Sequence, residues 1–92
     1  MLEFEWSPDK DRANQRKHGV AFAEASTIFR DPRSRTQFDY THSEGEDRFA
    51  TMGVSGKGRV LLVIHTPRGE RVRIISARRA TPRERRIYGD QV

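Results

Sequence analysis

Apolar and acidic residues alternate over residues 2–6, which predicts a short half-buried strand. Ser7-Pro8 follows and predicts a helix start, because serine caps helices and proline suits the first helical position. Gly19 is expected to end that helix, since glycine readily adopts the left-handed C-cap conformation. Apolar residues at helical spacing predict a second helix over residues 22–29, which Asp31-Pro32 ends.

Beyond residue 33 the apolar residues recur with a period of two, which indicates strands. We expect them over residues 36–40, 47–54, 59–65 and 71–78. A capping box formed by Thr81 and Glu84 then predicts a last helix over about residues 82–88. This order predicts one α+β domain, residues 1–92, in which an antiparallel β-meander sheet carries two N-terminal helices and a short C-terminal helix.

The hairpin loops predict which strand residues lie opposite one another. A two-residue loop at Gly56-Lys57 places Arg48 opposite His65, and a three-residue loop in the next hairpin places His65 opposite Arg71. Arg73 then shares their face, because alternate residues of a strand point the same way. This register predicts three arginines around one histidine at the end of the sheet, with an almost entirely apolar face on the other side.

Positive charge is concentrated near the end of the sequence. The chain has 18 Lys and Arg against 13 Asp and Glu, and residues 68–86 alone hold eight arginines and two glutamates. Arginine favours bidentate contacts with phosphate, so RNA or DNA is the leading partner class and an acidic protein surface the second.

Composition also excludes several kinds of protein. The chain has no cysteine, which excludes disulfides, thiolate nucleophiles and cysteine-based zinc sites. No apolar run is long enough for a membrane helix or a signal peptide, so we expect a cytoplasmic protein without membrane contact.

Six segments between Phe4 and about Tyr88 together resemble one family. They are WSPDK, NQRKHGV, FAEASTIFRDP, HSEGEDRF, GRVLLVIHT and RVRIISARRATPRERRIY. In this order they resemble the BrnT family of ribonuclease toxins from type II toxin–antitoxin systems. The resemblance implies a RelE-like fold and an endoribonuclease that acts on free or ribosome-bound RNA and arrests growth. It also implies a BrnA-type antitoxin as partner, a heterotetrameric complex, and operator DNA bound only through the antitoxin.

Metal-independent RNA cleavage needs activation of the 2′-hydroxyl, positive charge at the phosphorane and an acid for the leaving 5′-oxygen. His65 is the acid–base candidate, because histidine titrates near neutrality and the predicted register surrounds it with arginines. Arg73, with Arg78 or Arg79, is expected to stabilise charge, and of the last two only Arg79 shares the predicted His65 face. Alternatively, His65 is a packed strand-end residue, and Arg78-Arg79 contacts phosphates nonspecifically or an acidic antitoxin segment.

Five further residues are candidates for RNA binding. Arg48 and Arg71 offer charge to phosphates. Trp6 and Tyr88 offer rings on which bases stack, or they pack against the core instead. Lys17 also offers charge, although the helix dipole alone is sufficient to explain the presence of Lys17 and His18 in the last turn of a helix.

The turn HSEGED invites a metal hypothesis, because His42, Glu44 and Glu46 alternate along it. An exposed acidic turn is the simpler interpretation, and we expect no metal site. We also expect no cofactor, because the sequence lacks a glycine-rich phosphate loop. His42 becomes a second acid–base candidate only if this turn folds over the edge of the sheet.

Two other functions are compatible with the arginine cluster. One is a non-catalytic module that binds RNA or DNA backbones, and the other is an interaction protein that docks an acidic partner. The family resemblance is what favours an endoribonuclease over both.

Overall fold

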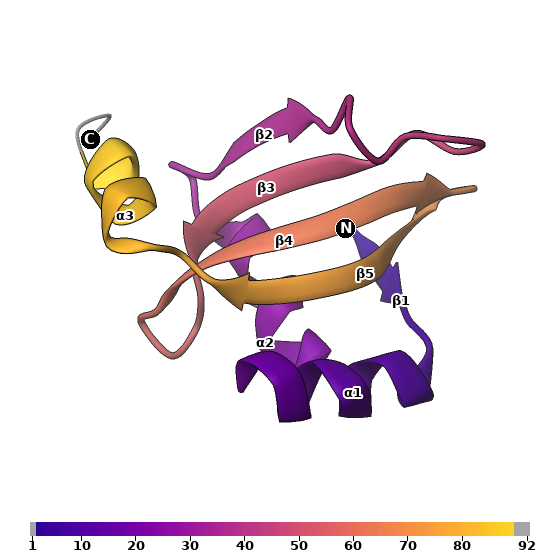
Figure 1. Cartoon of the computed structure of the whole chain (residues 1–92), viewed down its shortest axis with the longest axis horizontal. Helices are drawn as coiled ribbons and strands as arrows, with labels where there is room; N and C mark the ends of the chain where they lie inside the picture. The colour runs from indigo at the N-terminus through magenta and orange to yellow at the C-terminus, as the bar shows by residue number, and fades with distance from the viewer. Residues whose placement is uncertain (1, 90–92) are drawn as a thin grey trace.

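The computed structural model describes residues 2–89 (Figure 1). Strand β1 (Glu3–Glu5) leads into helices α1 (Pro8–His18) and α2 (Phe22–Ser26) and the 3₁₀ helix η1 (Thr27–Arg30). Strands β2 (Arg35–Phe38), β3 (Phe49–Val54), β4 (Val60–Arg68) and β5 (Arg71–Arg79) follow, and helix α3 (Pro82–Gly89) comes last. The predicted α+β class and the order of the elements are confirmed. None of the helices within residues 2–89 is long and apolar enough to span a membrane.

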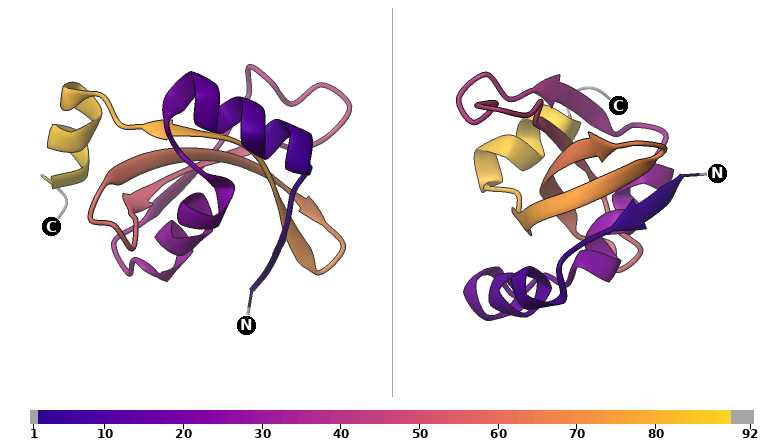
Figure 2. Two further views of the ribbon diagram at one scale, coloured as in Figure 1. Left: turned by 90° about the horizontal axis from the view of Figure 1, so that it is seen from below. Right: turned by 90° about the vertical axis from the view of Figure 1, so that its right-hand side faces the viewer.

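The five strands form one sheet in the order β1-β5-β4-β3-β2. Strands β2 to β5 make the predicted antiparallel meander, and β1 adds to it as a parallel edge strand beside the first half of β5. Helix α1 lies along the second half of β5, while α2 and η1 pack behind the sheet (Figures 1 and 2). The buried core between these helices and the sheet consists of Val20, Phe22, Ala25, Ile28, Leu61, Val63, Ile74 and Ala77.

The predicted caps of the first and last helices are confirmed, whereas the second helix, predicted over residues 22–29, is divided into α2 and the 3₁₀ helix η1. The Ser7 hydroxyl accepts a hydrogen bond from the Lys10 amide at 3.3 Å, and Gly19 ends α1 with φ of 68°. At the start of α3, Thr81 and Glu84 exchange side-chain-to-backbone hydrogen bonds of 2.9 and 3.1 Å. Each cap supplies partners for backbone groups that the helix leaves unpaired.

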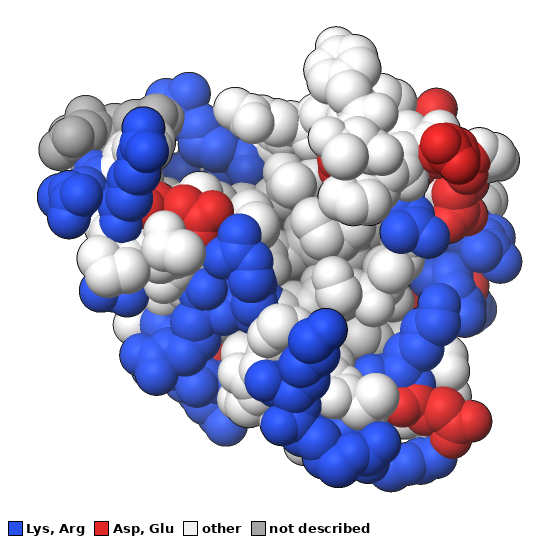
Figure 3. All heavy atoms as spheres, in the orientation of Figure 1, with Lys and Arg blue, Asp and Glu red and all other residues white. Residues whose placement is uncertain are grey.

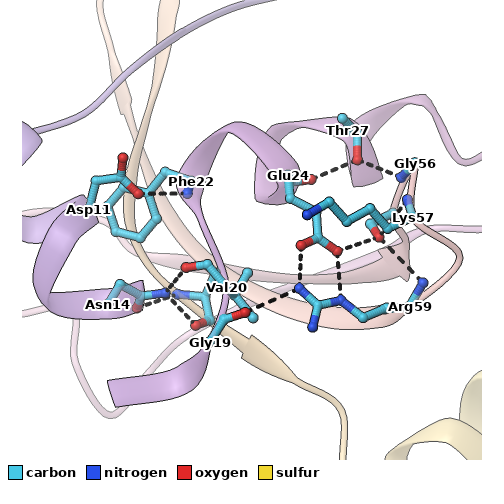
Figure 4. Close-up of polar contacts among 12 residues, drawn as sticks. Asp11, Asn14, Gly19, Val20, Phe22, Glu24, Thr27, Gly56, Lys57 and Arg59 are labelled. Carbon is cyan, nitrogen blue, oxygen red and sulfur yellow. Dashed lines mark hydrogen bonds and ion pairs between the residues drawn. The ribbon is translucent and has the colours of Figure 1, made fainter. Parts of the chain in front are cut away.

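Asn14 of α1 holds that helix against the sheet (Figure 4). Its amide donates to the Ala77 carbonyl at 2.8 Å and accepts from the Ala77 N–H at 3.1 Å, as a neighbouring strand would. The same amide donates to the Val20 carbonyl at 2.8 Å. A buried polar side chain is thereby satisfied, and so are the backbone N–H and C=O of Ala77, which lie beyond the reach of β1.

Glu24 of α2 fastens the β3–β4 hairpin to the helical layer (Figure 4). Its carboxylate accepts hydrogen bonds from Nε and Nη2 of Arg59 and from the Ser55 hydroxyl, the last at 2.7 Å. Arg59 also donates to the Gly19 carbonyl at 3.2 Å. The hydrogen bonds from Arg59 keep the pKa of Glu24 below its ordinary value, although burial opposes its ionisation.

The predicted register of the three long strands is wrong by one residue in the first hairpin and by three residues at His65 in the second. Val54 faces Val60, so five residues separate β3 from β4, and Phe49 rather than Arg48 lies opposite His65. In the next hairpin Arg68 faces Arg71, so the loop has two residues, with Gly69 at φ of 61°. His65 therefore faces Ile74, not Arg71.

A bulge adds to this difference. The pairing of β4 with β5 shifts between Ile64 and His65, which leaves Ile75 as the extra residue of β5. Ile74 and Ala77, three positions apart, are consequently both buried in the core. Since a shift of one residue turns a side chain to the opposite face, the predicted faces are wrong for β3 against β4 throughout, and for β4 against the part of β5 that precedes the bulge.

Candidate functional site

The sheet face that α2 and η1 do not cover carries a groove with two lobes. The first lobe has a volume of about 540 Å³, and the second, beneath α3, has about 270 Å³. Both lobes share Ala50 and Leu62 in their floor. Figure 3 looks onto this face and shows a largely uncharged centre, with Lys and Arg side chains to its left, below it and to its right, and Asp and Glu side chains among them.

Four imidazole and guanidinium side chains from separate parts of the chain line the first lobe, together with the carboxylate of Asp39. His18 comes from the last turn of α1, His42 from the loop between β2 and β3, Arg48 from the start of β3, and Arg78 from the end of β5. The floor between them is made by Ile64, Ile75 and Ser76 in addition to the shared residues. The lobe thus combines imidazoles and guanidinium groups over an apolar floor.

Asp39 holds the β2–β3 loop in place over the sheet. Its backbone N–H donates to the Arg48 carbonyl at 2.8 Å, and its carboxylate accepts from the N–H groups of Thr41 and His42 at 3.1 and 3.3 Å. The same carboxylate lies 3.0 Å from His42 Nδ1. Burial raises the pKa of Asp39, but these contacts with His42 outweigh it and hold that pKa below its ordinary value.

This arrangement meets the condition under which His42 becomes an acid–base candidate. A carboxylate at Nδ1 favours the tautomer that carries its proton there, so Nε2 is left available to a ligand. Sequence reasoning considered His42 mainly as a metal ligand and His18 only as a helix-end cation. The loop geometry that brings them to one lobe depends on Asp39, which no motif in the sequence marks.

Arg78 is held by Glu84 through two hydrogen bonds of 2.8 and 3.0 Å. Its Nη1 also donates to the Arg79 carbonyl at 3.2 Å. The Arg78 hydrogen bonds, together with those of Thr81, lower the pKa of Glu84 to about 2 despite its partial burial. Within residues 2–89 no acceptor contacts Arg78 Nε, so the edge formed by Nε and Nη2 is open to a ligand.

His65 lies in the core rather than among arginines. It is 9% exposed, its Nε2 lies 2.7 Å from the Thr51 hydroxyl, and its ring sits between Phe29 and Phe49 with centroids 5.0 and 6.0 Å away. Burial lowers the pKa of His65 to about 4. The predicted convergence of three arginines on this ring is wrong, because the register that produced it is wrong. Of Arg48, Arg71 and Arg73, Arg71 does line a surface hollow that His65 also lines.

The other arginines predicted for the site lie elsewhere. Arg73 pairs with Glu5 at 2.8 Å, and Arg71 lies 3.5 Å from Glu3, so both join β5 to β1. Arg79 lies opposite Leu61 in the β4–β5 pairing and shares the face of His65, as predicted. That face is the one against which α2 and η1 pack, so Arg79 lies on the side of the sheet away from the groove. Of the predicted cluster, only Arg48 and Arg78 lie in the groove.

The three remaining candidates differ in position. Trp6 packs against the core, with its ring 6.2 Å from that of Phe22, so the packing alternative describes it better than the stacking one. Lys17 is exposed in the last turn of α1, beside the groove residue His18. Tyr88 lines the second lobe, and its hydroxyl donates to Asp31.

The residues of the HSEGED turn take separate partners. His42 contacts Asp39, whereas Glu46 lies 3.4 Å from Arg48 and 3.9 Å from Arg68. Over residues 2–89 no group of three His, Asp or Glu side chains is arranged to hold a metal ion.

Comparison with known proteins places the chain in a family. A family model described as "Ribonuclease toxin, BrnT, of type II toxin-antitoxin system" matches residues 6–84. The chain belongs to the BrnT family. A crystal structure of the Brucella abortus ribonuclease toxin BrnT is similar, with a TM-score of 0.64 and 23% sequence identity over 88% of this chain and 99% of that one. At this identity the likeness establishes a shared fold, and the comparison with curated proteins gave no match.

The BrnT assignment confirms the family resemblance of the sequence. It makes a ribonuclease toxin of a toxin–antitoxin system the class of this protein, and an antitoxin and RNA the classes of its partners. The residues that act on RNA are not part of that assignment and are argued below from the groove.

Proposed function

We propose that this BrnT-family chain is an endoribonuclease that cleaves RNA without a metal ion in the first lobe of the open groove. The observation that supports this site most directly is the meeting of His18, His42, Arg48 and Arg78 around one apolar floor. Family membership supports the reaction class. The chemistry needs only groups that bind a phosphate and groups that move a proton, and the lobe contains both.

Arg78 and Arg48 are the proposed phosphate ligands. The open Nε–Nη2 edge of Arg78 offers two parallel donors, which match two oxygens of a phosphodiester. Arg48 is 32% exposed at its side chain and contacts Glu46 only at 3.4 Å, so its guanidinium has donors to spare. Together they place positive charge where the phosphorane develops.

The proposed acid–base pair is His42 and His18. With Asp39 at Nδ1, neutral His42 presents the lone pair of Nε2 and accepts the proton of the ribose 2′-hydroxyl. The freed O2′ attacks the adjacent phosphorus, an O2′–P bond forms and the P–O5′ bond breaks. Protonated His18 gives its proton to the leaving O5′. The products are a 2′,3′-cyclic phosphate and a 5′-hydroxyl, with no oxidant or metal consumed.

The test is cleavage of total cellular RNA by purified protein in EDTA, alongside expression from a tightly repressed promoter. We expect the wild type to fragment RNA and arrest growth, and we expect the variants His42→Ala and Arg48→Ala to lose most of both activities. Arg12→Ala is the charge-matched control, because Arg12 is exposed on α1 and pairs with Asp9. His65→Gln is the control for the buried histidine and keeps its activity under conditions where it is folded.

Three results would contradict the proposal in different ways. RNA that is bound but intact in cells and in vitro indicates the non-catalytic binding module instead. Cleavage that EDTA abolishes contradicts metal independence. Equal loss of activity in Arg12→Ala and Arg48→Ala contradicts the location of the site.

We further propose that the antitoxin is of the BrnA type and neutralises the protein by covering this groove. An apolar floor with an arginine rim suits a partner that presents apolar and acidic side chains. The complex is proposed to be a heterotetramer in which operator DNA is contacted only by the antitoxin. Mass measurement of the co-purified complex tests the stoichiometry, and loss of binding in Arg48→Glu but not in Arg12→Glu tests the covered face.

A further inference from the structure

The second lobe of the groove has no role in the cleavage step. It is bounded by β2, by the floor residues Met52 and Leu62, and by α3 through Ile87 and Tyr88. Its volume of about 270 Å³ lies below the roughly 300–1,000 Å³ of pockets that hold a drug-sized ligand. A space of this size suits one flat ring system rather than a whole nucleotide.

The walls of this lobe are suited to an aromatic ring. Met52 and Leu62 supply an apolar floor, and the Tyr88 ring is held in place because its hydroxyl donates to Asp31. Asp31 is itself fixed, since it accepts from the Val54 amide at 2.9 Å. Ile87 also lines the lobe and is 48% exposed, so its side chain is accessible to a ring that enters there.

One side of the lobe is polar. Arg35 lies opposite Met52 and Gln37 opposite Ala50 in the β2–β3 pairing, so both side chains share the face of the groove floor. Both are exposed and both line the lobe. They offer a guanidinium fork and an amide to the edge of any ring that rests on the floor.

The two lobes adjoin each other, which places this ring near the phosphate. They share Ala50 and Leu62, and the Arg78–Glu84 pair joins them, with Arg78 in the first lobe and Glu84 in the second. An RNA chain whose phosphate contacts Arg78 therefore has a neighbouring base within reach of α3.

We propose that the second lobe is a nucleobase subsite that prefers guanine at a fixed position beside the cleaved bond. Arginine pairs in bidentate fashion with O6 and N7 of guanine, and Arg35 supplies that fork above an apolar floor. Good bidentate pairs discriminate against the wrong base by roughly 5- to 150-fold, converted from the energy range for such contacts. This inference rests on the proposed endoribonuclease activity of the first lobe.

The test maps new 5′-hydroxyl ends across cellular RNA after brief expression of the full chain. For the wild type we expect guanine at one position beside the cut, enriched at least about fivefold over the composition of the RNA. Arg35→Ala and Arg35→Lys are expected to lose the enrichment while cleavage continues, because lysine keeps the charge but not the fork. Arg33→Ala is the matched control, since Arg33 is exposed nearby and does not line the lobe.

The outcomes separate the subsite from the activity beneath it. Absence of new ends and normal growth with wild-type protein overturn the proposed function, and the subsite with it. New ends without a preferred base, or a guanine preference unchanged in both Arg35 variants, overturn the subsite and leave the activity intact. Enrichment of a base other than guanine overturns the assignment of the ligand.

Discussion

Replacement of His65 by glutamine should change how the stability of the protein depends on pH. His65 is buried between two phenylalanine rings, and this burial lowers its pKa to about 4 from an ordinary value of 6.5. The folded state therefore resists protonation of the ring, whereas the unfolded chain accepts a proton below pH 6.5. Glutamine removes the titration and keeps a polar group near Thr51.

The size of the effect follows from the difference between the two pKa values. Each unit of pKa difference corresponds to about 1.4 kcal/mol, so full protonation of His65 lowers the free energy of unfolding by roughly 3 kcal/mol. Because the folded pKa is lowered, stability is complete above pH 6.5 and is lost as the pH falls toward 4. At pH 4.5 the wild type should have lost about 2.5 kcal/mol that His65→Gln does not lose.

Urea unfolding at several pH values between 7.5 and 4.5 measures this difference. Carboxylates also titrate at the lower end of the range, so the quantity of interest is the wild-type loss minus the loss in His65→Gln. His18→Gln, at the half-buried histidine that ends α1, is the matched control and should follow the wild type. Parallel pH curves for wild type and His65→Gln would show that His65 is not buried as described, and a catalytic role for it would have to be considered again.

Three further predictions concern the contacts that hold the helices. Asn14→Leu leaves the Ala77 N–H and C=O without partners and should lower the free energy of unfolding by about 2–4 kcal/mol in urea titrations. Glu24→Gln breaks a buried ion pair and should cost about 3–5 kcal/mol, whereas disruption of the exposed Arg12 pair by Arg12→Gln should cost less than about 1 kcal/mol by the same assay. The pKa of Glu84 is lowered to about 2, so its contribution to the stability of α3 is complete above pH 4.5 and is lost as the pH falls toward 2. Far-UV circular dichroism of the wild type should therefore show α3 unfolding over that range. Glu84→Gln should lack this transition.

Local signals in the sequence predicted the elements well. Ser7, Gly19, Asp31-Pro32 and the Thr81 capping box act within one turn of the chain, so their effect does not depend on distant residues. The antiparallel order of the last four strands was also predictable, because each is connected to the next by a loop without an intervening helix.

The register was not predictable because it depends on single residues. In the first hairpin Gly58, and not Gly56, takes the left-handed conformation. In the second hairpin Gly69 begins a two-residue loop, where a three-residue loop was predicted. The bulge at Ile75 has no local signal at all. Since each such change inverts a face, His65 was expected among arginines and is found in the core.

The functional residues that sequence reasoning missed are brought together by the same long-range geometry. His18 and His42 lie 24 positions apart, and their meeting depends on how α1 and the β2–β3 loop flank the sheet. Arg78 was predicted as part of the site, but its pairing with Glu84 was not. That pair joins β5 to α3, a helix that the sequence predicted from its capping box alone.

The side-chain amide of Asn14 has a consequence for the behaviour of the protein outside its complex. An unpaired strand edge is a template on which another chain can add a strand, and such edges promote aggregation. Beyond the end of β1, the backbone of β5 at Ala77 is already occupied by this amide. Strand exchange between copies is thereby blocked at that segment. A toxin without its antitoxin therefore cannot add a strand of a second copy at this part of its sheet.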